Sequence, residues 1–187
     1  GLAWVGLWFM EKGLRWILYV AATVGQADGA VGHVIAPGPM VVPLMGFGLI
    51  WLALWAGRGR MIGLGITAAA FVLWSQTTRP AILVADNGAL IGRDTAQGRA
   101  LSRAKGSGFV AGIWLENDGN PTLQEDAAAR IGIQTQGRVS QTNLGPWRVV
   151  QVSGKTALAD MIGCQGADVL ISNQTDAGAR PCAVFDI

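Results

Sequence analysis

Three consecutive residues near the C-terminal end, Gly154, Lys155 and Thr156, have the types that end a phosphate-binding loop. Such a loop needs another glycine five residues earlier, because the backbone curls there so that successive N–H groups point at the phosphates. That position holds Val149, inside the β-branched run 147–152, which predicts a strand. A strand, a Ser-Gly turn and a helix that starts near Thr156 therefore explain the stretch better than an ATPase site does.

Metal-dependent hydrolysis is a second chemistry to consider. The single histidine of the chain, His33, lies within residues 26–39, a segment whose glycines and prolines predict a loop. Isolated carboxylates, which are ordinarily solvated, are spread along the later part of the chain at Asp86, Asp168, Asp176 and Asp186. A two-metal site needs several imidazole and carboxylate ligands in one cleft. The sequence therefore predicts no metal ligand, no cofactor and no catalytic residue.

Nucleophilic and nucleic-acid chemistry have little support in the sequence. A Ser or Cys nucleophile needs a base within reach, and the only histidine lies outside the polar part of the chain. Basic residues alternate with apolar ones at residues 99–105, an arrangement that could follow a phosphate backbone. We favour a solvated strand face there, because acidic residues balance the basic ones over the whole polar part.

The composition divides the chain near residue 78. Over 187 residues the hydrophobic fraction is 51%, which is high for an ordinary globular domain. The part before Thr78 carries few charges, namely Glu11, Lys12, Arg15, Asp28, Arg58 and Arg60. These residues account for the whole net charge of +2, so the part that follows is neutral. The sequence predicts a membrane region at 1–78 and a polar domain at 79–187.

Two uncharged runs in the first part, 40–56 and 61–78, predict a transmembrane helical hairpin, because each just reaches the length that crosses a bilayer. Only four residues connect the runs, and two of them are Arg58 and Arg60. The positive-inside rule places this loop in the cytoplasm. A hairpin of buried core helices is the alternative.

Residues 2–24 predict a helix of another kind. At 100° per residue, its charged and aromatic side chains fall on one half of the helical wheel, opposite the aliphatic ones. This pattern is typical of a helix that lies in the lipid headgroup layer, and a tilted spanning helix is the alternative. Because the sequence opens inside this helix and stops inside the last predicted strand, we expect that sequence is missing at both ends.

The polar domain shows short β runs separated by turns, and then alternating strands and helices. The clearest signal is the turn at Asn87-Gly88 between apolar runs, which is typical of a β-hairpin. The predicted strands are 81–85, 89–93, 99–103, 147–152, 167–171 and 183–187. The predicted helices are 109–116, 123–130 and 156–164. This order favours an α/β or α+β domain over a β-sandwich.

Several segments together resemble the C-terminal part of the ComEC-type competence proteins, the inner-membrane channels that take up single-stranded DNA in bacterial transformation. They are the aromatic first helix, "LMGFGLIWLALWAGRGRMIGLGI", "ILVADNGALIGR", "FVAGIWLENDGNP", and "ALADMIGCQGADVLIS" followed by "ARPCAVFDI". The resemblance covers nearly the whole chain. It implies a multi-pass protein of the bacterial inner membrane whose membrane helices precede a periplasmic domain like a partial metallo-β-lactamase sandwich.

The same resemblance implies partners that this chain does not contain. These are membrane lipid, the remainder of the parent channel, DNA bound by the complete protein, and other competence proteins. The polar domain departs from hydrolytic members of the metallo-β-lactamase fold, because it lacks their His-x-His-x-Asp-His metal motif.

Three functions follow from these observations. The first is a non-catalytic part of a ComEC-like DNA-uptake channel, which is not an enzyme. The second is a metal-dependent nuclease whose ligands lie outside this sequence, and the third is a membrane-anchored scaffold.

The two cysteines, Cys164 and Cys182, predict a disulfide, because the expected topology places both in the oxidising periplasm. Two unrelated buried thiols are the alternative.

Overall fold

The computed structural model describes residues 3–27, 32–176 and 178–186. The chain divides into two compact units, Gly1–His33 and Val34–Ile187. Two ends of the predicted elements, Leu2 and Ile187, lie outside the described residues.

The first unit is built on one helix, α1 (Ala3–Gly25). Its charged side chains have partners on the helix itself: Arg15 forms an ion pair with Glu11 at 2.7 Å. The ammonium group of Lys12 lies 5.6 Å from the ring centroid of Trp8. Both contacts join residues four positions apart, which lie on one side of a helix. The charged and aromatic residues therefore share a side, as the wheel predicts.

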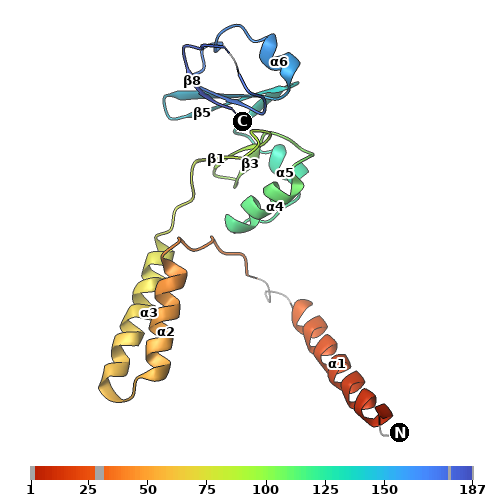
Figure 1. Ribbon diagram of the computed structural model, residues 1–187, viewed down its shortest axis with the longest axis vertical. Coiled ribbons are helices and arrows are strands. Elements are labelled where there is room, and N and C mark those ends of the chain that lie inside the picture. The colour runs from red at the N-terminus through yellow and green to blue at the C-terminus, as the bar shows by residue number, and fades with distance from the viewer. Residues whose placement is uncertain (1–2, 28–31, 177, 187) are drawn as a thin grey trace. The chain divides into compact units, whose positions relative to one another are not determined.

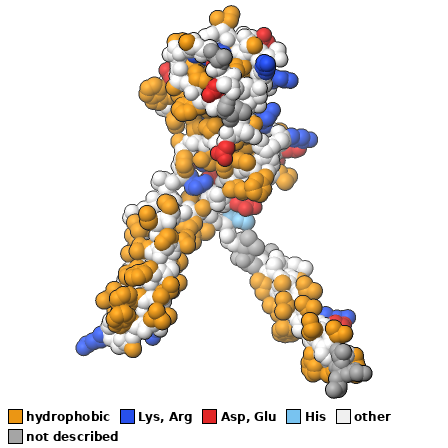
Figure 2. All heavy atoms as spheres, in the orientation of Figure 1, with side chains coloured by type: hydrophobic (Ala, Val, Ile, Leu, Met, Phe, Trp, Pro, Cys, Tyr) orange, Lys and Arg blue, Asp and Glu red, His pale blue; other side chains and the backbone are white. Residues whose placement is uncertain are grey.

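The second unit begins with a helical hairpin. Helix α2 (Val41–Leu54), the short 3₁₀ helix η1 (Gly57–Gly59) and α3 (Arg60–Ser75) follow one another, and α2 and α3 lie side by side (Figure 1). Glycines allow this close approach: a Cβ on Gly63 would lie 2.7 Å from the carbonyl oxygen of Gly48. Away from this contact, hydrophobic side chains cover the surface of the hairpin (Figure 2).

No helix in the described part of the chain is long and apolar enough to cross a membrane. Helix α2 has 14 residues and α3 has 16, which correspond to about 21 and 24 Å, against a hydrocarbon core of about 30 Å. Helix α1 has 23 residues, but its middle carries Glu11, Lys12 and Arg15. The uncharged runs overestimated the lengths of the two helices. For example, α2 ends at Leu54, whereas its uncharged run continues to residue 56.

Several predictions are therefore wrong. They are the fold class, which placed membrane helices ahead of a partial metallo-β-lactamase-like sandwich, and the multi-pass inner-membrane location. The periplasmic placement of the domain was part of that location and is wrong with it. The cytoplasmic placement of Arg58 and Arg60 was argued from the same spans and stays a prediction. The described chain is an α+β fold in which α2 and α3 form a short hairpin.

Two separate sheets follow the hairpin. The first has three antiparallel strands in the order β1-β2-β3, which are β1 (Ile82–Val84), β2 (Ile91–Arg93) and β3 (Ala100–Leu101). The second has five strands in sequence order, namely β4 (Gln134–Gln136), β5 (Val139–Leu144), β6 (Trp147–Val152), β7 (Val169–Ser172) and β8 (Ala183–Phe185). Strands β4, β5 and β6 are antiparallel, whereas β7 is parallel to both β6 and β8.

Three apolar clusters hold the sheets and helices together. One joins the first sheet to α4 (Gly108–Asn117) and α5 (Gln124–Ala128), and Leu115 of α4 is buried in it. The second contains Ile91 of the first sheet and Val149 and Ile171 of the second. The third joins the five-stranded sheet to α6 (Lys155–Ala159). The layers therefore follow the order α4 and α5, three-stranded sheet, five-stranded sheet, α6. We call this part of the chain the two-sheet domain.

A buried ion cluster connects the hairpin to the two-sheet domain. The side chain of Arg99 is fully buried and pairs with Asp118. Asp118 also accepts from Arg79, which follows α3, at 2.7 Å. The remaining N–H groups of Arg99 donate to the carbonyls of Gly92 and Pro80 at 3.2 and 3.1 Å. The solvated strand face predicted for residues 99–105 is therefore wrong at Arg99, because Asp118 allows its charge to be buried.

A disulfide joins Cys164 to Cys182, the pair for which the sequence predicted a bridge, with a Cα–Cα distance of 6.2 Å. Inside the loop that it closes, Arg180 forms an ion pair with Asp176. The Arg180 guanidinium also donates to main-chain carbonyls, including that of Met161 at 3.1 Å. Its hydrogen bond to Asp176 lowers the pKa of that carboxyl group below its usual value. The loop is thus fixed by one covalent bond and one charge pair.

Candidate anion-binding cleft

The Gly154-Lys155-Thr156 stretch is a turn followed by a short helix. Val149, where a phosphate loop would need glycine, is buried in β6. The N–H of Gly154 donates to the side-chain oxygen of Asn173 at 2.7 Å, so that group is already occupied. Helix α6 starts at Lys155 and has five residues, which is shorter than the predicted 156–164. The strand–turn–helix interpretation is confirmed.

The acidic residues do not gather into a metal site. Within residues 3–27, 32–176 and 178–186, no group of three His, Cys, Asp or Glu side chains could hold a metal ion. Asp168 accepts from the main-chain N–H of Arg148 at 2.7 Å, and Asp186 accepts from that of Asp176 at 2.6 Å. Asp86 and His33 are exposed. These carboxylates therefore have structural partners or face water, and the predicted lack of a bound metal stays a prediction.

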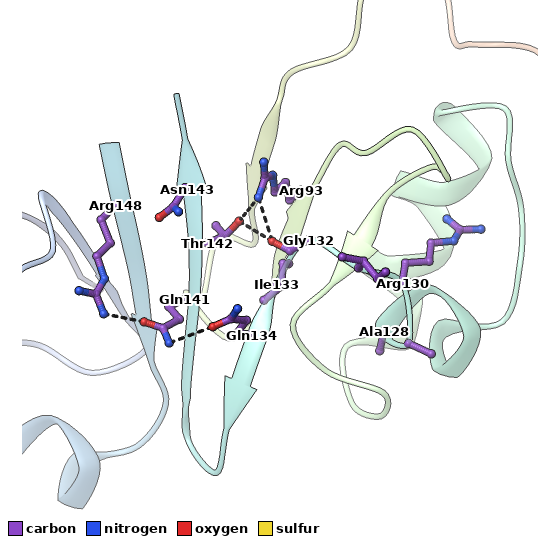
Figure 3. Close-up of a pocket in the computed structure, with 12 residues that line it drawn as sticks. Arg93, Ala128, Arg130, Gly132, Ile133, Gln134, Gln141, Thr142, Asn143 and Arg148 are labelled. Carbon is purple, nitrogen blue, oxygen red and sulfur yellow. Dashed lines mark hydrogen bonds between the residues drawn. The ribbon is translucent and has the colours of Figure 1, made fainter. Parts of the chain in front are cut away.

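The two-sheet domain has a cleft of about 770 Å³. Its walls come from the end of β2, from residues 128–134 after α5, and from β5 and β6. Strand β4 pairs with β5 only as far as Gln141. The last residues of β5, including Asn143, pair with β6 on one side and line the cleft. The cleft therefore lies where the short edge strand leaves β5 uncovered (Figure 3).

Arg93, at the end of β2, extends across the cleft toward the second sheet. Its guanidinium donates to the carbonyl oxygen of Gly132 at 3.1 Å and to the hydroxyl of Thr142 at 3.2 Å. Thr142 donates in turn to Gly132 at 2.7 Å. These bonds fix the guanidinium and use one of its nitrogens, so the other N–H groups remain available to a ligand.

A second guanidinium belongs to Arg148 on β6. It donates to the side-chain oxygen of Gln141 at 2.7 Å, and Gln141 donates to Gln134 at 3.4 Å (Figure 3). This row crosses three neighbouring strands on the face of the sheet opposite to Thr142, because residues 141 and 142 of β5 point to opposite faces. A third lining residue, Arg130, differs, because its guanidinium donates to the carbonyl of Arg99 at 2.9 Å and points away from Arg93 in Figure 3.

The charge of the cleft is positive and is not balanced locally. Neither Asp nor Glu is among its lining residues. Among the described residues, Arg93 and Arg148 make their side-chain bonds to neutral oxygens and form no ion pair. A guanidinium without a carboxylate partner attracts anions and can bind a phosphate with two parallel hydrogen bonds. The cleft is therefore suited to an anion, although the polar part as a whole is neutral.

The sequence did not reveal this cleft, because two of the strands beside it, β4 and β5, were not predicted. Strand β5 has polar side chains on both faces and lacks the apolar alternation of a half-buried strand. Two tight turns were the available signal: Gly137 precedes Arg138 between β4 and β5, and Gly145 precedes Pro146 between β5 and β6. Both glycines have positive φ, at 60° and 58°, as two-residue hairpin turns require.

Comparisons with protein-family models, curated proteins and solved structures gave no match for this chain.

Proposed function

We propose that this chain is a non-catalytic part of a ComEC-like DNA-uptake protein and that it contacts single-stranded DNA through the cleft between Arg93 and Arg148. The observation that carries the proposal is that both guanidiniums line a cleft without carboxylates, Arg93 beside Thr142 and Arg148 beside Gln141, on the two sides of the uncovered end of β5. In this scheme the rest of the parent protein supplies the passage for DNA, and other competence proteins deliver it.

The cleft favours contact with the phosphate backbone over recognition of bases. Aromatic side chains, on which unpaired bases stack, are absent from its lining. Two fixed guanidiniums, at Arg93 and Arg148, supply charge-assisted hydrogen bonds that do not depend on sequence. We therefore expect weak binding that tolerates any sequence and falls with salt, which suits a strand that must move past the site.

Salt dependence gives the sharpest test. Binding of a fluorescent oligothymidine to the full chain is measured by anisotropy at several salt concentrations. Each phosphate contact to a single strand contributes about 0.7 to the slope of log K against log salt. The double variant Arg93→Gln/Arg148→Gln should reduce that slope by about 1.4 and weaken binding at low salt.

Two controls separate the cleft from general charge. The variant Arg58→Gln/Arg60→Gln removes the same charge from the hairpin tip and should leave the slope unchanged. The variant Arg93→Lys/Arg148→Lys keeps the charge and should keep most of the slope. No binding by the unaltered chain, or an equal loss in the hairpin control, would contradict the proposal and favour a scaffold without a DNA contact.

The link to DNA uptake requires a test in the source organism. Replacing both cleft arginines with glutamine in the parent gene should lower transformation frequency, whereas the hairpin control should not. Protein levels are compared by immunoblot. Normal transformation with the cleft variant at a normal protein level would show that this contact has no part in uptake.

A further inference from the structure

A second, smaller pocket has a different lining and lies at the turn between β4 and β5. Its volume is about 240 Å³. The lining residues are polar or small, and neither Asp nor Glu is among them. Two cations, Arg103 and Arg138, contribute to it and are exposed. Among the described residues neither forms an ion pair.

The floor of this pocket consists of buried polar side chains between the two sheets. Ser102, Ser140 and Gln151 are 3%, 5% and 1% exposed. Ser140 and Gln151 are paired neighbours on β5 and β6. Each of them has a hydrogen-bond partner in the described chain, Ser102 with Ile91, Ser140 with Thr135, and Gln151 with the carbonyl of Gly88, as buried polar groups require. Three polar residues therefore meet at one point between the sheets and line the pocket.

The hydrogen bonds among these buried side chains leave one donor and one acceptor available to a ligand. The hydroxyl of Ser102 accepts from the N–H of Ile91 at 3.1 Å, so its own hydrogen is free to donate. Thr135 donates to the carbonyl of Ser102 at 3.2 Å and contacts the hydroxyl of Ser140 at 3.0 Å. Ser140 must then be the donor in that contact, and its lone pairs remain to accept. A ligand that fits these residues needs one oxygen that accepts from Ser102 and one hydroxyl that donates to Ser140.

Arg138 is held at the rim by its surroundings. The carbonyl of Arg138 accepts from the N–H of Ser153 at 2.9 Å. A Cβ on Gly154 would lie 2.6 Å from a guanidinium nitrogen of Arg138, and Gly154 has a φ of +97°. The guanidinium therefore lies where a side chain at residue 154 would otherwise be. Gly154, which has no side chain, therefore allows the guanidinium of Arg138 to lie beside the pocket.

We propose that this pocket binds a terminal phosphate group, as found in inorganic phosphate or a nucleoside 5′-monophosphate. The two guanidiniums of the rim match the charge and the fork geometry of phosphate oxygens. A partly protonated phosphate can both accept from Ser102 and donate to Ser140, whereas sulfate at neutral pH can only accept. The volume lies below that of most ligand pockets, so the pocket accommodates the phosphate group, and a nucleoside attached to it would lie outside.

This proposal does not rest on the DNA contact proposed above, and calorimetry of the full chain at constant ionic strength tests it. Inorganic phosphate, sulfate and deoxyadenosine 5′-monophosphate are titrated separately. We expect one saturable site that binds phosphate at least about tenfold more tightly than sulfate, which corresponds to one charge-assisted hydrogen bond. Binding of phosphate alone identifies the free ion as the ligand, and binding of the nucleotide alone identifies a phosphate ester. Competition between the two supports a site for the shared group.

Variants locate the site. Arg138→Gln should weaken phosphate binding about tenfold or more, and because Arg138 is exposed the fold should not change. Arg138→Lys should restore part of the affinity, and Arg148→Gln, in the larger cleft, should have no effect. The proposal is overturned if neither phosphate nor the nucleotide binds, if sulfate binds as tightly as phosphate, or if Arg138→Gln binds like the unaltered chain.

Discussion

The helical hairpin and the two-sheet domain are held together by different forces. In the hairpin, Gly48 and Gly63 let two backbones approach, and Thr67 donates to the carbonyl of Gly63 at 2.9 Å. In the domain, buried polar and charged groups are paired at Arg99 and Asp118. A disulfide closes the final loop. The hairpin therefore depends on close packing, whereas the domain adds charge pairs and a covalent bond to its apolar clusters.

This difference predicts which perturbations each region withstands. Changes of pH or redox state act on titratable groups and thiols, and residues 41–75 contain no Asp, Glu, His or Cys. Added side-chain volume lowers stability where surfaces are closely packed, and there a single methyl group is enough to do so. The four predictions below test this division in order of decreasing effect.

The largest effect is expected at Asp118. Asp118→Asn leaves the fully buried guanidinium of Arg99 without its counter-charge, and removal of one partner from a buried pair costs about 3–5 kcal/mol. Urea unfolding followed by far-UV circular dichroism should show the loss. Because the helices of the hairpin do not need this pair, a helical signal should remain after the domain has unfolded.

Arg79→Gln is the matched control for Asp118. The side chain of Arg79 is 22% exposed, so its loss should cost less than about 1 kcal/mol. An equal cost for both variants would show that the pair with Arg99 is not the main contribution.

Reduction of the disulfide should have the next largest effect. The bond between Cys164 and Cys182 spans 18 positions, and the chain-entropy model assigns a loop of this size about 3 kcal/mol. The double variant Cys164→Ser/Cys182→Ser should lower the free energy of unfolding by that amount, and dithiothreitol should do the same to the unaltered chain. Hydrogen exchange should increase in β7 and β8, while exchange in α2 and α3 stays unchanged. Faster exchange in the hairpin would show that the hairpin also depends on the disulfide, against the difference drawn between the two regions.

The sequence predicted the elements whose pattern is local. Strand 147–152 has the predicted bounds, and helix 109–116 differs by one residue at each end. Both have strong apolar character and clear flanking turns. By contrast, the membrane spans were wrong, because a run without charges does not reveal where a helix ends. For example, Trp55 adopts an extended conformation and ends α2 inside the run.

The candidate sites could not be predicted, because they depend on pairing between distant segments. Arg93 and Arg148 are 55 positions apart in the sequence, and the cleft appears only when β4 stops short of the end of β5. The burial of Arg99 likewise depends on Asp118, which comes from a loop after α4. The charges of residues 99–105 gave no sign of which would be buried, since solvated and paired arginines have the same local pattern.

The third prediction concerns shape in the hairpin. Gly63→Ala would place a Cβ 2.7 Å from the carbonyl oxygen of Gly48 and 2.7 Å from the main-chain nitrogen of Leu52. The backbones must separate, at a cost of about 1–3 kcal/mol, which outweighs the helix propensity gained from alanine. Gly65→Ala is the control on the same helix, because nothing lies within 4 Å of its added Cβ. It should stabilise α3 slightly, as measured by thermal unfolding. Equal shifts in both variants would refute close packing at Gly63.

The smallest effect is a pH dependence at Asp176. The hydrogen bond from Arg180 lowers the pKa of the folded Asp176 carboxyl below its usual value. The folded state therefore binds this proton less readily than the unfolded state does. Stability from the pair is fully present above the unfolded pKa and is lost as the pH falls through the folded one.

Urea unfolding of the unaltered chain and of Asp176→Asn between neutral pH and about pH 2 measures this contribution. The two curves of stability against pH should differ at neutral pH and converge in acid. Asp86→Asn, at an exposed turn, should follow the unaltered chain throughout. The hairpin has no acid that titrates in this range, so the exchange rates of α2 and α3, corrected for the intrinsic effect of pH, should stay constant. A constant difference between the Asp176 variant and the unaltered chain would show that Asp176 stabilises the loop by its shape instead of its charge.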